Sequence, residues 1–309
     1  MRQRASIVRL VAGAFLALVV VAGTPRAQEA VRVASKLDTE SSLLGAMILL
    51  VLDAGGIKTV NKLQLGPTNI LRSAIIAGEI DIYPEYTGNG AVFYSDDEDP
   101  AWKDARGGYD KVRALDLANH QLVWLQPAPA DNSWVIAVPR AAAAAEHLAT
   151  MVDFAAWVRR SGAVKLAASA EFVESPAALP AFEEAYGFSL TPSQLLVLAG
   201  GDTAVTMRAA AEGISGVDAA MAYGTDGALS VLGLVVLADP KRAQVVYAPA
   251  PVVRASVLQR YPAMRERLAT IFRSLDEASL RRLNARIAVD GERPRDVARD
   301  YLGSSLQRR

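Results

Sequence analysis

Short apolar runs alternate with longer amphipathic stretches from Val31 onward, and this alternation predicts an α/β fold. The pattern forms two series, one ending before Pro127 and one beginning after Pro129. In the first series we expect strands at 31–35, 59–65, 80–83 and 122–125, and helices at 43–54, 68–77 and 109–119. A chain of 309 residues with 51% apolar residues is long enough for two domains.

The second series has the same alternation and then becomes helical. We expect strands at 134–138, 164–168, 194–198, 217–223, 234–238 and 245–247, and helices at 141–160, 176–186 and before Gly213. The remainder is predicted to be mostly helical, at 256–274, 276–289 and 295–306, with Pro294 as a first-turn proline.

One unit with the same spacing occurs in both series. In the first, Asp81 opens a strand and Tyr86 follows five residues later; in the second, Asp218 and Tyr223 repeat this spacing. Each tyrosine precedes a turn that contains glycine and threonine. The repetition predicts two similar lobes that face one cleft. The alternative is that strand-to-helix turns commonly collect glycine, aspartate and threonine.

The segment 81–90 is the strongest candidate for a binding site. We expect Pro84 to end the ladder pairing of its strand, which places Tyr86 on a turn just beyond a strand end, where α/β proteins build ligand sites. Asp81 and Glu85 could suggest acid–base chemistry, but no neighbouring histidine or lysine completes a triad. Structural roles are favoured for both acids, and for Asp226 as a cap or turn residue. An exported enzyme remains the less favoured alternative.

Four aromatic residues lie at segment ends in the two series, namely Tyr86, Trp134, Tyr223 and Tyr247. Ring faces attract cations, and aromatic cages bind quaternary ammonium groups. Convergence of these four rings would therefore build a cage, although packing in a core or between lobes would also explain each ring. The sequence predicts no metal and no cofactor, because neither histidine has a partner at metal-ligand spacing.

The first 27 residues have the pattern of a secretory signal, with three early arginines before the apolar run 10–22. This run of 13 residues is short for a membrane span. Cleavage would leave 29 basic and 33 acidic residues, a net charge of −4, which argues against nucleic acid as a partner. The chain contains no cysteine and so no lipoprotein attachment point. We expect a cleaved, periplasmic protein.

The motif Asp-Ile-Tyr-Pro-Glu-Tyr-Thr-Gly at 81–88 resembles the glycine betaine/choline/carnitine-binding proteins of ABC importers. Three further segments also resemble that family: Ser35-Lys36 with Thr39-Glu40, Leu65-Gly66-Pro67-Thr68, and 223–227. The resemblance covers about 30–306. It implies a type II periplasmic-binding-protein fold, with two lobes, each a mixed sheet flanked by helices, and two hinge crossovers. Lobe 1 would comprise 28–130 and 240–309, and lobe 2 would comprise 131–239.

The resemblance also implies a ligand, a partner and a set of binding residues. The ligand would be a quaternary ammonium osmoprotectant, the partner a membrane permease, and the protein a monomer. The binding residues would be Tyr86, Trp134, Tyr223 and Tyr247 around the cation, with Asn89 and Thr68 as polar contacts. Relatives often carry glutamine where Ser41 and Ser42 stand, which predicts weaker binding or a different ligand. A protein of the same fold that binds an amino acid is the alternative.

Overall fold

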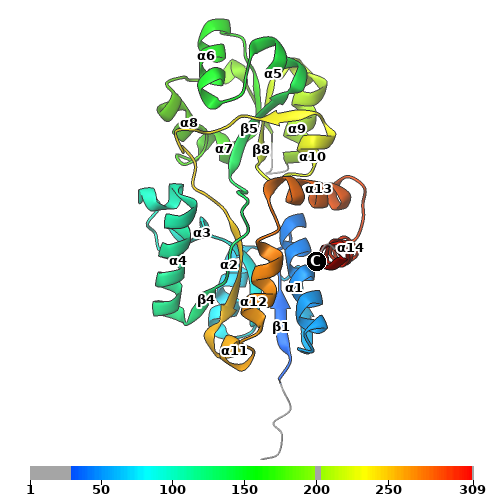
Figure 1. The fold of residues 1–309 in the computed structure, drawn as a ribbon. Coiled ribbons are helices and arrows are strands. Elements are labelled where there is room, and N and C mark those ends of the chain that lie inside the picture. The colour runs from blue at the N-terminus through cyan, green and yellow to red at the C-terminus, as the bar shows by residue number, and fades with distance from the viewer. Residues whose placement is uncertain (1–28, 199–202, 308–309) are drawn as a thin grey trace, which may run out of the picture.

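The computed structural model describes residues 29–198 and 203–307, which form two lobes joined by two extended segments (Figure 1). The predicted signal at 1–27 lies outside the described residues. Within the described ranges, no helix has both the length and the apolar character needed to cross a membrane.

Lobe 1 is built on a mixed sheet with the strand order β2-β1-β3-β10-β4. Strand β1 pairs in parallel with β2 and β3, whereas β10 is antiparallel to β3 and β4. The strands are β1 (Val31–Ala34), β2 (Thr59–Lys62), β3 (Ile82–Tyr86), β4 (Leu122–Trp124) and β10 (Pro249–Arg254). The helices are α1 (Thr39–Ala54), α2 (Thr68–Ala77), α3 (Asn89–Phe93), α4 (Ala105–His120), α11 (Ala255–Arg260), α12 (Met264–Phe272), α13 (Glu277–Ala288) and α14 (Pro294–Gln307).

Lobe 2 repeats this sheet with the order β7-β6-β8-β5-β9. Strand β6 pairs in parallel with β7 and β8, and β5 is antiparallel to β8 and β9. The strands are β5 (Trp134–Pro139), β6 (Leu166–Ser169), β7 (Leu195–Leu198), β8 (Ala219–Tyr223) and β9 (Leu234–Val236). The helices are α5 (Arg140–Glu146), α6 (Met151–Ser161), α7 (Ala170–Glu174), α8 (Leu179–Tyr186), α9 (Thr203–Glu212) and α10 (Ala228–Val231). The predicted pair of mixed sheets with two crossovers is confirmed.

The repeated aspartate–tyrosine unit lies at the centre of both sheets. The backbone N–H of Arg32 donates to Asp81 Oδ2 at 2.9 Å, and that of Lys165 donates to Asp218 Oδ2 at 3.0 Å. Each aspartate lies directly before a central strand, β3 or β8. Its hydrogen bond links the start of that strand to the backbone of the neighbouring parallel segment. The five-residue spacing therefore reflects two equivalent strands, which end at their tyrosines.

The expectation that Pro84 ends its strand is wrong. Strand β3 continues to Tyr86, and Pro84 lies opposite Pro251 of β10. Pro84 and Pro251 form a pair that exchanges no hydrogen bonds, so neither residue has to donate an N–H to the other strand. On the other side, the pairing with β1 is confined to Ile82, and Pro84 interrupts no ladder bond there.

Three other expected boundaries are also wrong. Residues 245–247 form no strand, and the strand of this region is β10, which begins at Pro249. The two prolines of β10 lower its strand propensity, so the sequence pattern did not indicate it. The helix expected at 141–160 is two helices, because His147 takes a left-handed conformation and Thr150 caps a new helix. The helix expected at 256–274 is interrupted before Pro262.

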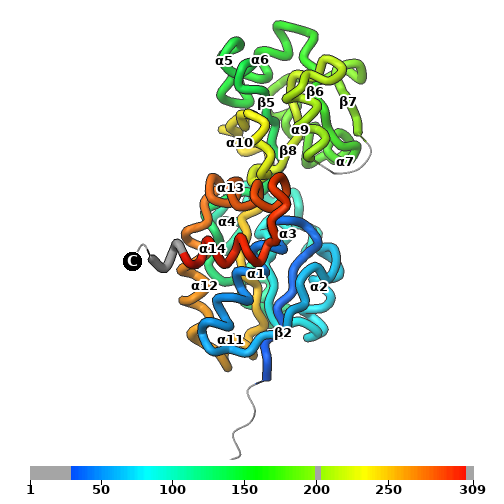
Figure 2. Tube along the Cα trace, turned by 90° about the vertical axis from the view of Figure 1, so that its right-hand side faces the viewer, coloured from blue at the N-terminus to red at the C-terminus, as the bar shows by residue number. Residues whose placement is uncertain are grey.

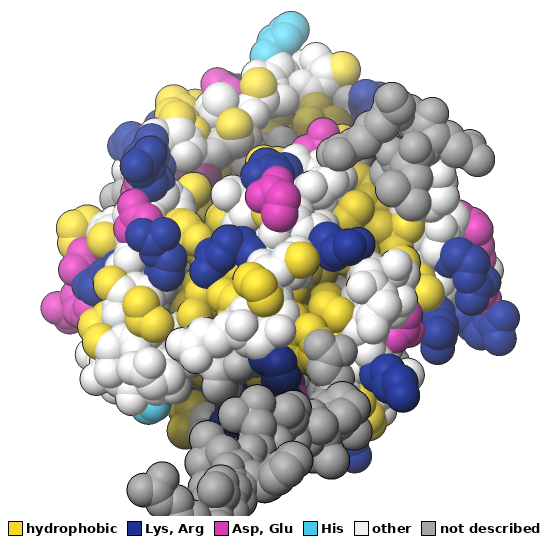
Figure 3. Space-filling view, turned by 60° about the horizontal axis from the view of Figure 1, so that its bottom comes forward, with side chains coloured by type: hydrophobic (Ala, Val, Ile, Leu, Met, Phe, Trp, Pro, Cys, Tyr) yellow, Lys and Arg dark blue, Asp and Glu magenta, His cyan; other side chains and the backbone are white. Residues whose placement is uncertain are grey.

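Helix α1 forms the centre of the lobe 1 core. Leu43, Leu44, Met47 and Ile48 are fully buried within it. Helix α14 packs along α1, whereas α13 lies between the two lobes (Figure 2). Figure 3 shows the end of lobe 1 that lies farthest from lobe 2. Where grey atoms do not cover it, Lys and Arg side chains are scattered among hydrophobic and acidic ones.

Candidate functional site

A cavity of about 500 Å³ lies between the lobes at the ends of β3 and β8. Such a volume is in the usual range for a small-molecule site. Its walls come from the β1–α1 turn, the first turns of α2, α3 and α9, the turn after β8, the crossovers and α13. The lining residues are Lys36, Asp38, Thr39, Glu40, Thr68, Tyr86, Asn89, Asn132, Thr203, Tyr223, Thr225, Asp226, Gly227, Tyr247, Asn284 and Ala288.

Tyr86 forms the lobe 1 wall, and polar groups hold it in place. Its hydroxyl donates to Glu40 Oε1 at 2.9 Å, and the side chain is only 6% exposed. The ammonium nitrogen of Lys36 lies 4.7 Å from the centroid of the Tyr86 ring. A cation of the protein itself therefore already contacts this ring.

Glu85 is the buried acid that organises this wall. It forms an ion pair with Lys36, and it accepts the backbone N–H of Tyr86 at 2.8 Å and Asn89 Nδ2 at 2.6 Å. Asp81 is paired with Arg32 in the same lobe. Both acids thus have the structural contacts that were expected of them. Lys36, which follows the end of β1, reaches Glu85 although the two residues are far apart in the sequence.

Tyr223 forms the lobe 2 wall, and other rings support it. The ring of Trp134 stacks on Tyr223 with centroids 6.4 Å apart and planes inclined by 20°. Phe172 packs edge-on against Trp134, with ring centroids 6.0 Å apart. The Tyr223 N–H donates to Asp226 Oδ2 at 2.8 Å, so Asp226 closes the turn as expected.

Tyr247 enters the cavity from the second crossover. Its backbone N–H donates to Asp131 Oδ1 at 2.8 Å, which ties the two crossovers together. Gly88 lies directly beneath the ring, where a β-carbon would approach two ring carbons to 2.9 Å. The glycine after Tyr86 and Thr87 is therefore a steric requirement of the site.

Glu40 is a site residue that the sequence reasoning did not single out. It is 4% exposed, lines the cavity and accepts Asn284 Nδ2 at 2.8 Å in addition to the Tyr86 hydroxyl. Burial raises its pKa to about 7, against the opposing effect of the hydrogen bonds from Thr225, Asn284 and Tyr86. Its position in the Ser-Lys-x-x-Thr-Glu motif was the available signal, as it was for Lys36.

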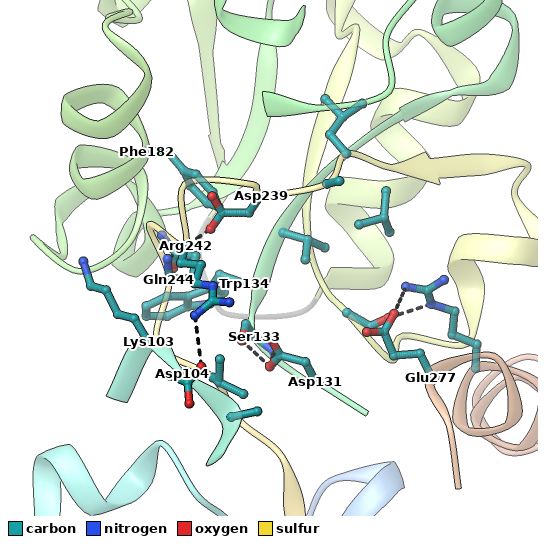
Figure 4. Close-up of a pocket in the computed structure, with 18 residues that line it drawn as sticks. Lys103, Asp104, Asp131, Ser133, Trp134, Phe182, Asp239, Arg242, Gln244 and Glu277 are labelled. Carbon is teal, nitrogen blue, oxygen red and sulfur yellow. Dashed lines mark hydrogen bonds and ion pairs between the residues drawn. The ribbon is translucent and has the colours of Figure 1, made fainter. Parts of the chain in front are cut away.

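Five of the six residues predicted to bind the ligand line this cavity: Tyr86, Asn89, Tyr223, Tyr247 and Thr68. The sixth, Trp134, does not line it. Trp134 supports Tyr223 and lines a second groove of about 560 Å³, formed by both crossovers and both lobes. Figure 4 shows this groove, with Trp134 near the ion pair between Arg242 and Asp104. In the described part of the chain, no cluster of potential metal ligands is present.

The family model described as the substrate binding domain of the ABC-type glycine betaine transport system matches residues 29–304. The chain is 54% identical over 296 residues to the Escherichia coli protein named glycine betaine-binding protein YehZ, and the match covers 96% of this chain and 97% of that protein. It is 31% identical over 282 residues to the glycine-betaine-binding protein of Pseudomonas aeruginosa, and this match covers 89% and 87%.

The solved structures support the same fold. The structure described as apo YehZ from Escherichia coli superposes with a TM-score of 0.82 at 56% identity, and covers 89% of this chain and 98% of that chain. A glycine betaine/carnitine/choline ABC transporter structure superposes with a TM-score of 0.80 at 21% identity, with the same coverage, and demonstrates the fold alone.

Proposed function

Because this chain belongs to the family of substrate-binding domains of ABC-type glycine betaine transport systems, we propose that it captures glycine betaine or a similar quaternary ammonium compound in the cavity between its lobes. The single observation that supports this best is the pair of facing tyrosines, Tyr86 and Tyr223, at the ends of equivalent strands in one cavity. The protein then delivers the ligand to the membrane permease of its importer.

The cavity offers one set of groups for each end of a betaine. The trimethylammonium group would lie against the rings of Tyr86, Tyr223 and Tyr247, where a desolvated cation–π contact contributes about 2 kcal/mol against about 0.5–1 kcal/mol when exposed. The carboxylate would meet Lys36, the one basic side chain among the described residues of the lining, with Thr68 and Asn89 nearby as polar contacts. Trp134 contributes by supporting Tyr223.

This division of the cavity predicts the ligand class. A zwitterion with a methylated cation uses both sets of groups, whereas choline lacks the carboxylate and a simple amino acid lacks the methyl groups. We therefore propose that glycine betaine binds more tightly than either. Calorimetry with the three ligand types tests this order, and preference for glycine over glycine betaine would rule out the cage.

The two facing tyrosines can be tested directly. We expect Y86A and Y223A each to weaken glycine betaine binding at least tenfold, which corresponds to about 1.4 kcal/mol, because each removes one ring face. Titration calorimetry on the purified variants measures this. Y261F is a suitable control, since Tyr261 belongs to the lobe 1 core and does not line the cavity. Unchanged binding by both alanine variants would refute the cage.

We further propose that residues 1–27 form a cleaved export signal, so that the mature protein works in the periplasm as a binding protein and not as an enzyme. The proposed lobe limits are 28–130 with 240–309, and 131–239. The family match beginning at residue 29 supports the first limit. Mass spectrometry of the protein secreted into the periplasm of an expressing cell would give the mature N-terminus, and a retained residue 1 would contradict cleavage.

A further inference from the structure

Helix α13 belongs to lobe 1 by its packing but also touches lobe 2. Leu280 and Leu283 are buried in the lobe 1 core. From the same helix, Arg281 Nε donates to the carbonyl of Gly224 at 2.6 Å, and Asn284 Nδ2 donates to the carbonyl of Thr225 at 2.9 Å. Figures 1 and 2 both show α13 between the lobes. We call Arg281, Asn284 and the turn 224–227 the interlobe contact.

The turn fits against its neighbours without spare room. A β-carbon on Gly227 would collide with the backbone nitrogen of Ala285, so the turn rests directly on the backbone of α13. A β-carbon on Gly224 would collide with the carbonyl oxygen of Asp131 in the first crossover. The turn that follows Tyr223 is therefore enclosed between α13 and the first crossover.

A chain of hydrogen bonds joins the two tyrosine walls through this contact. The Tyr86 hydroxyl donates to Glu40, and Asn284 Nδ2 donates both to Glu40 at 2.8 Å and to Thr225 O at 2.9 Å. Glu40, Asn284 and Thr225 are each 5% exposed or less. Because one amide nitrogen satisfies an acceptor in each lobe, the chain defines the separation between Tyr86 and the turn after Tyr223.

The orientation of the Asn284 amide follows from these partners. Both of its neighbours at Nδ2 are acceptors, a carboxylate and a carbonyl, so the reverse orientation would bring three oxygens together. Asn284 Oδ1 is buried without a hydrogen-bond partner among the described atoms. The side chain is thus held by its two donated bonds, which cross from one lobe to the other.

We propose that the interlobe contact sets the separation of the two tyrosine walls, with Arg281 and Asn284 as positioning residues. Weakening the contact from outside the cavity should change the resting lobe arrangement and lower ligand affinity. The affinity part rests on the proposed function, whereas the lobe arrangement can be measured without any ligand.

Arg281 and Arg282 provide a matched pair for the test. Arg281 does not line the ligand cavity but the second groove, so its loss removes no ligand contact. Arg282 is the next residue, is exposed, and bonds Ser279 of its own helix at 3.0 Å. The chain has no cysteine. Spin labels can therefore be attached at L117C in α4 and V152C in α6, two exposed positions outside both cavities.

Double electron–electron resonance measures the distance between these two spin labels. Without ligand, this distance reports the resting arrangement of the lobes. We expect R281A to shift or broaden the distance distribution and R282A to leave it as in the parent. Calorimetry should show at least fivefold weaker glycine betaine binding by R281A and parental binding by R282A. Circular dichroism confirms that each variant is folded.

The glycine in the turn gives a second, independent variant. G227A pushes the turn away from α13, whereas G303A introduces the same methyl group in α14 where nothing lies within 4 Å. We expect G227A to change the distance distribution and G303A to leave it unchanged. Parental distances in both R281A and G227A would overturn the proposal, and so would weaker binding by R281A with parental distances. If the parent binds no betaine, the proposed function fails, but the distance comparison still decides this inference.

Discussion

Tyr86 and Tyr223 end equivalent strands, yet the two lobes hold these rings by different means. Lobe 1 uses charge: Tyr86 bonds Glu40, and the ammonium of Lys36, paired with Glu85, lies over its ring. Lobe 2 uses other rings, since Tyr223 stacks on Trp134. The same strand-end geometry therefore produces one wall that depends on electrostatics and one that depends on aromatic packing.

This difference has a consequence for how each wall responds to change. The protein loses much stability when one partner of a buried charge pair is removed, and the contribution of buried charges to stability depends on pH. Stacked rings lose packing area in proportion to what is removed and are insensitive to pH. Perturbations chosen for one wall should thus leave the other largely unaffected.

Removing the cation of lobe 1 should have the largest effect. We expect K36M to lower the free energy of unfolding by about 3–5 kcal/mol, because it leaves the fully buried Glu85 without its ionic partner. Urea denaturation at pH 7 measures this. The double variant K36M/E85Q removes both charges and should recover most of the loss. A loss below about 1 kcal/mol in K36M would show that the charge pair does not support this wall.

Removing the support of lobe 2 should have a smaller effect on stability. We expect W134A to lower the free energy of unfolding by about 2–3 kcal/mol, less than for a fully buried tryptophan, because Trp134 is half-buried. Glycine betaine binding should weaken severalfold, since Tyr223 loses the ring behind it. W134F retains an aromatic ring and should keep most of the affinity. Equal affinities of W134A and W134F would contradict a supporting role of the stack.

The smallest effect concerns protons at Glu40. Burial raises the pKa of Glu40 to about 7 in the folded protein, above its usual value of 4.5. Between these two values the folded state binds more protons than the unfolded state, so the contribution of Glu40 to stability falls as pH rises and is constant above about pH 7. Urea denaturation of the parent and E40Q across this range measures the difference.

The same carboxyl couples ligand binding to pH. A bound cation favours the charged form of Glu40 and lowers its pKa, so binding releases a proton and affinity rises between about pH 6 and pH 8. A lowering by one unit would give up to about a tenfold change. Calorimetry at both pH values should show this rise in the parent and a flat response in E40Q. A slope that persists in E40Q would assign the effect to another group.

Local signals predicted many of the elements well. The helix 68–77 was expected with its actual limits because Gly78 ends it in a left-handed conformation that glycine adopts freely. The capping pair of Thr150 and Asp153, in contrast, was overlooked within an alanine-rich helical pattern. Strand β10 was missed because Pro249 and Pro251 lower local strand propensity, whereas its pairing with β3 and β4 depends on the finished sheet.

The candidate site, too, could be predicted from the sequence only in part. The sequence alone identified Tyr86 and Tyr223 as equivalent positions, because a five-residue spacing from an aspartate is a local property of the chain. The structure showed that each of them ends its strand. Tertiary structure decided that Trp134 stands behind Tyr223 and not in the cavity, and that Lys36 pairs with Glu85. It also joined Glu40 to Asn284, 244 positions away. Hydrogen bonds over such separations depend on how whole lobes pack, and no local pattern of residues encodes that.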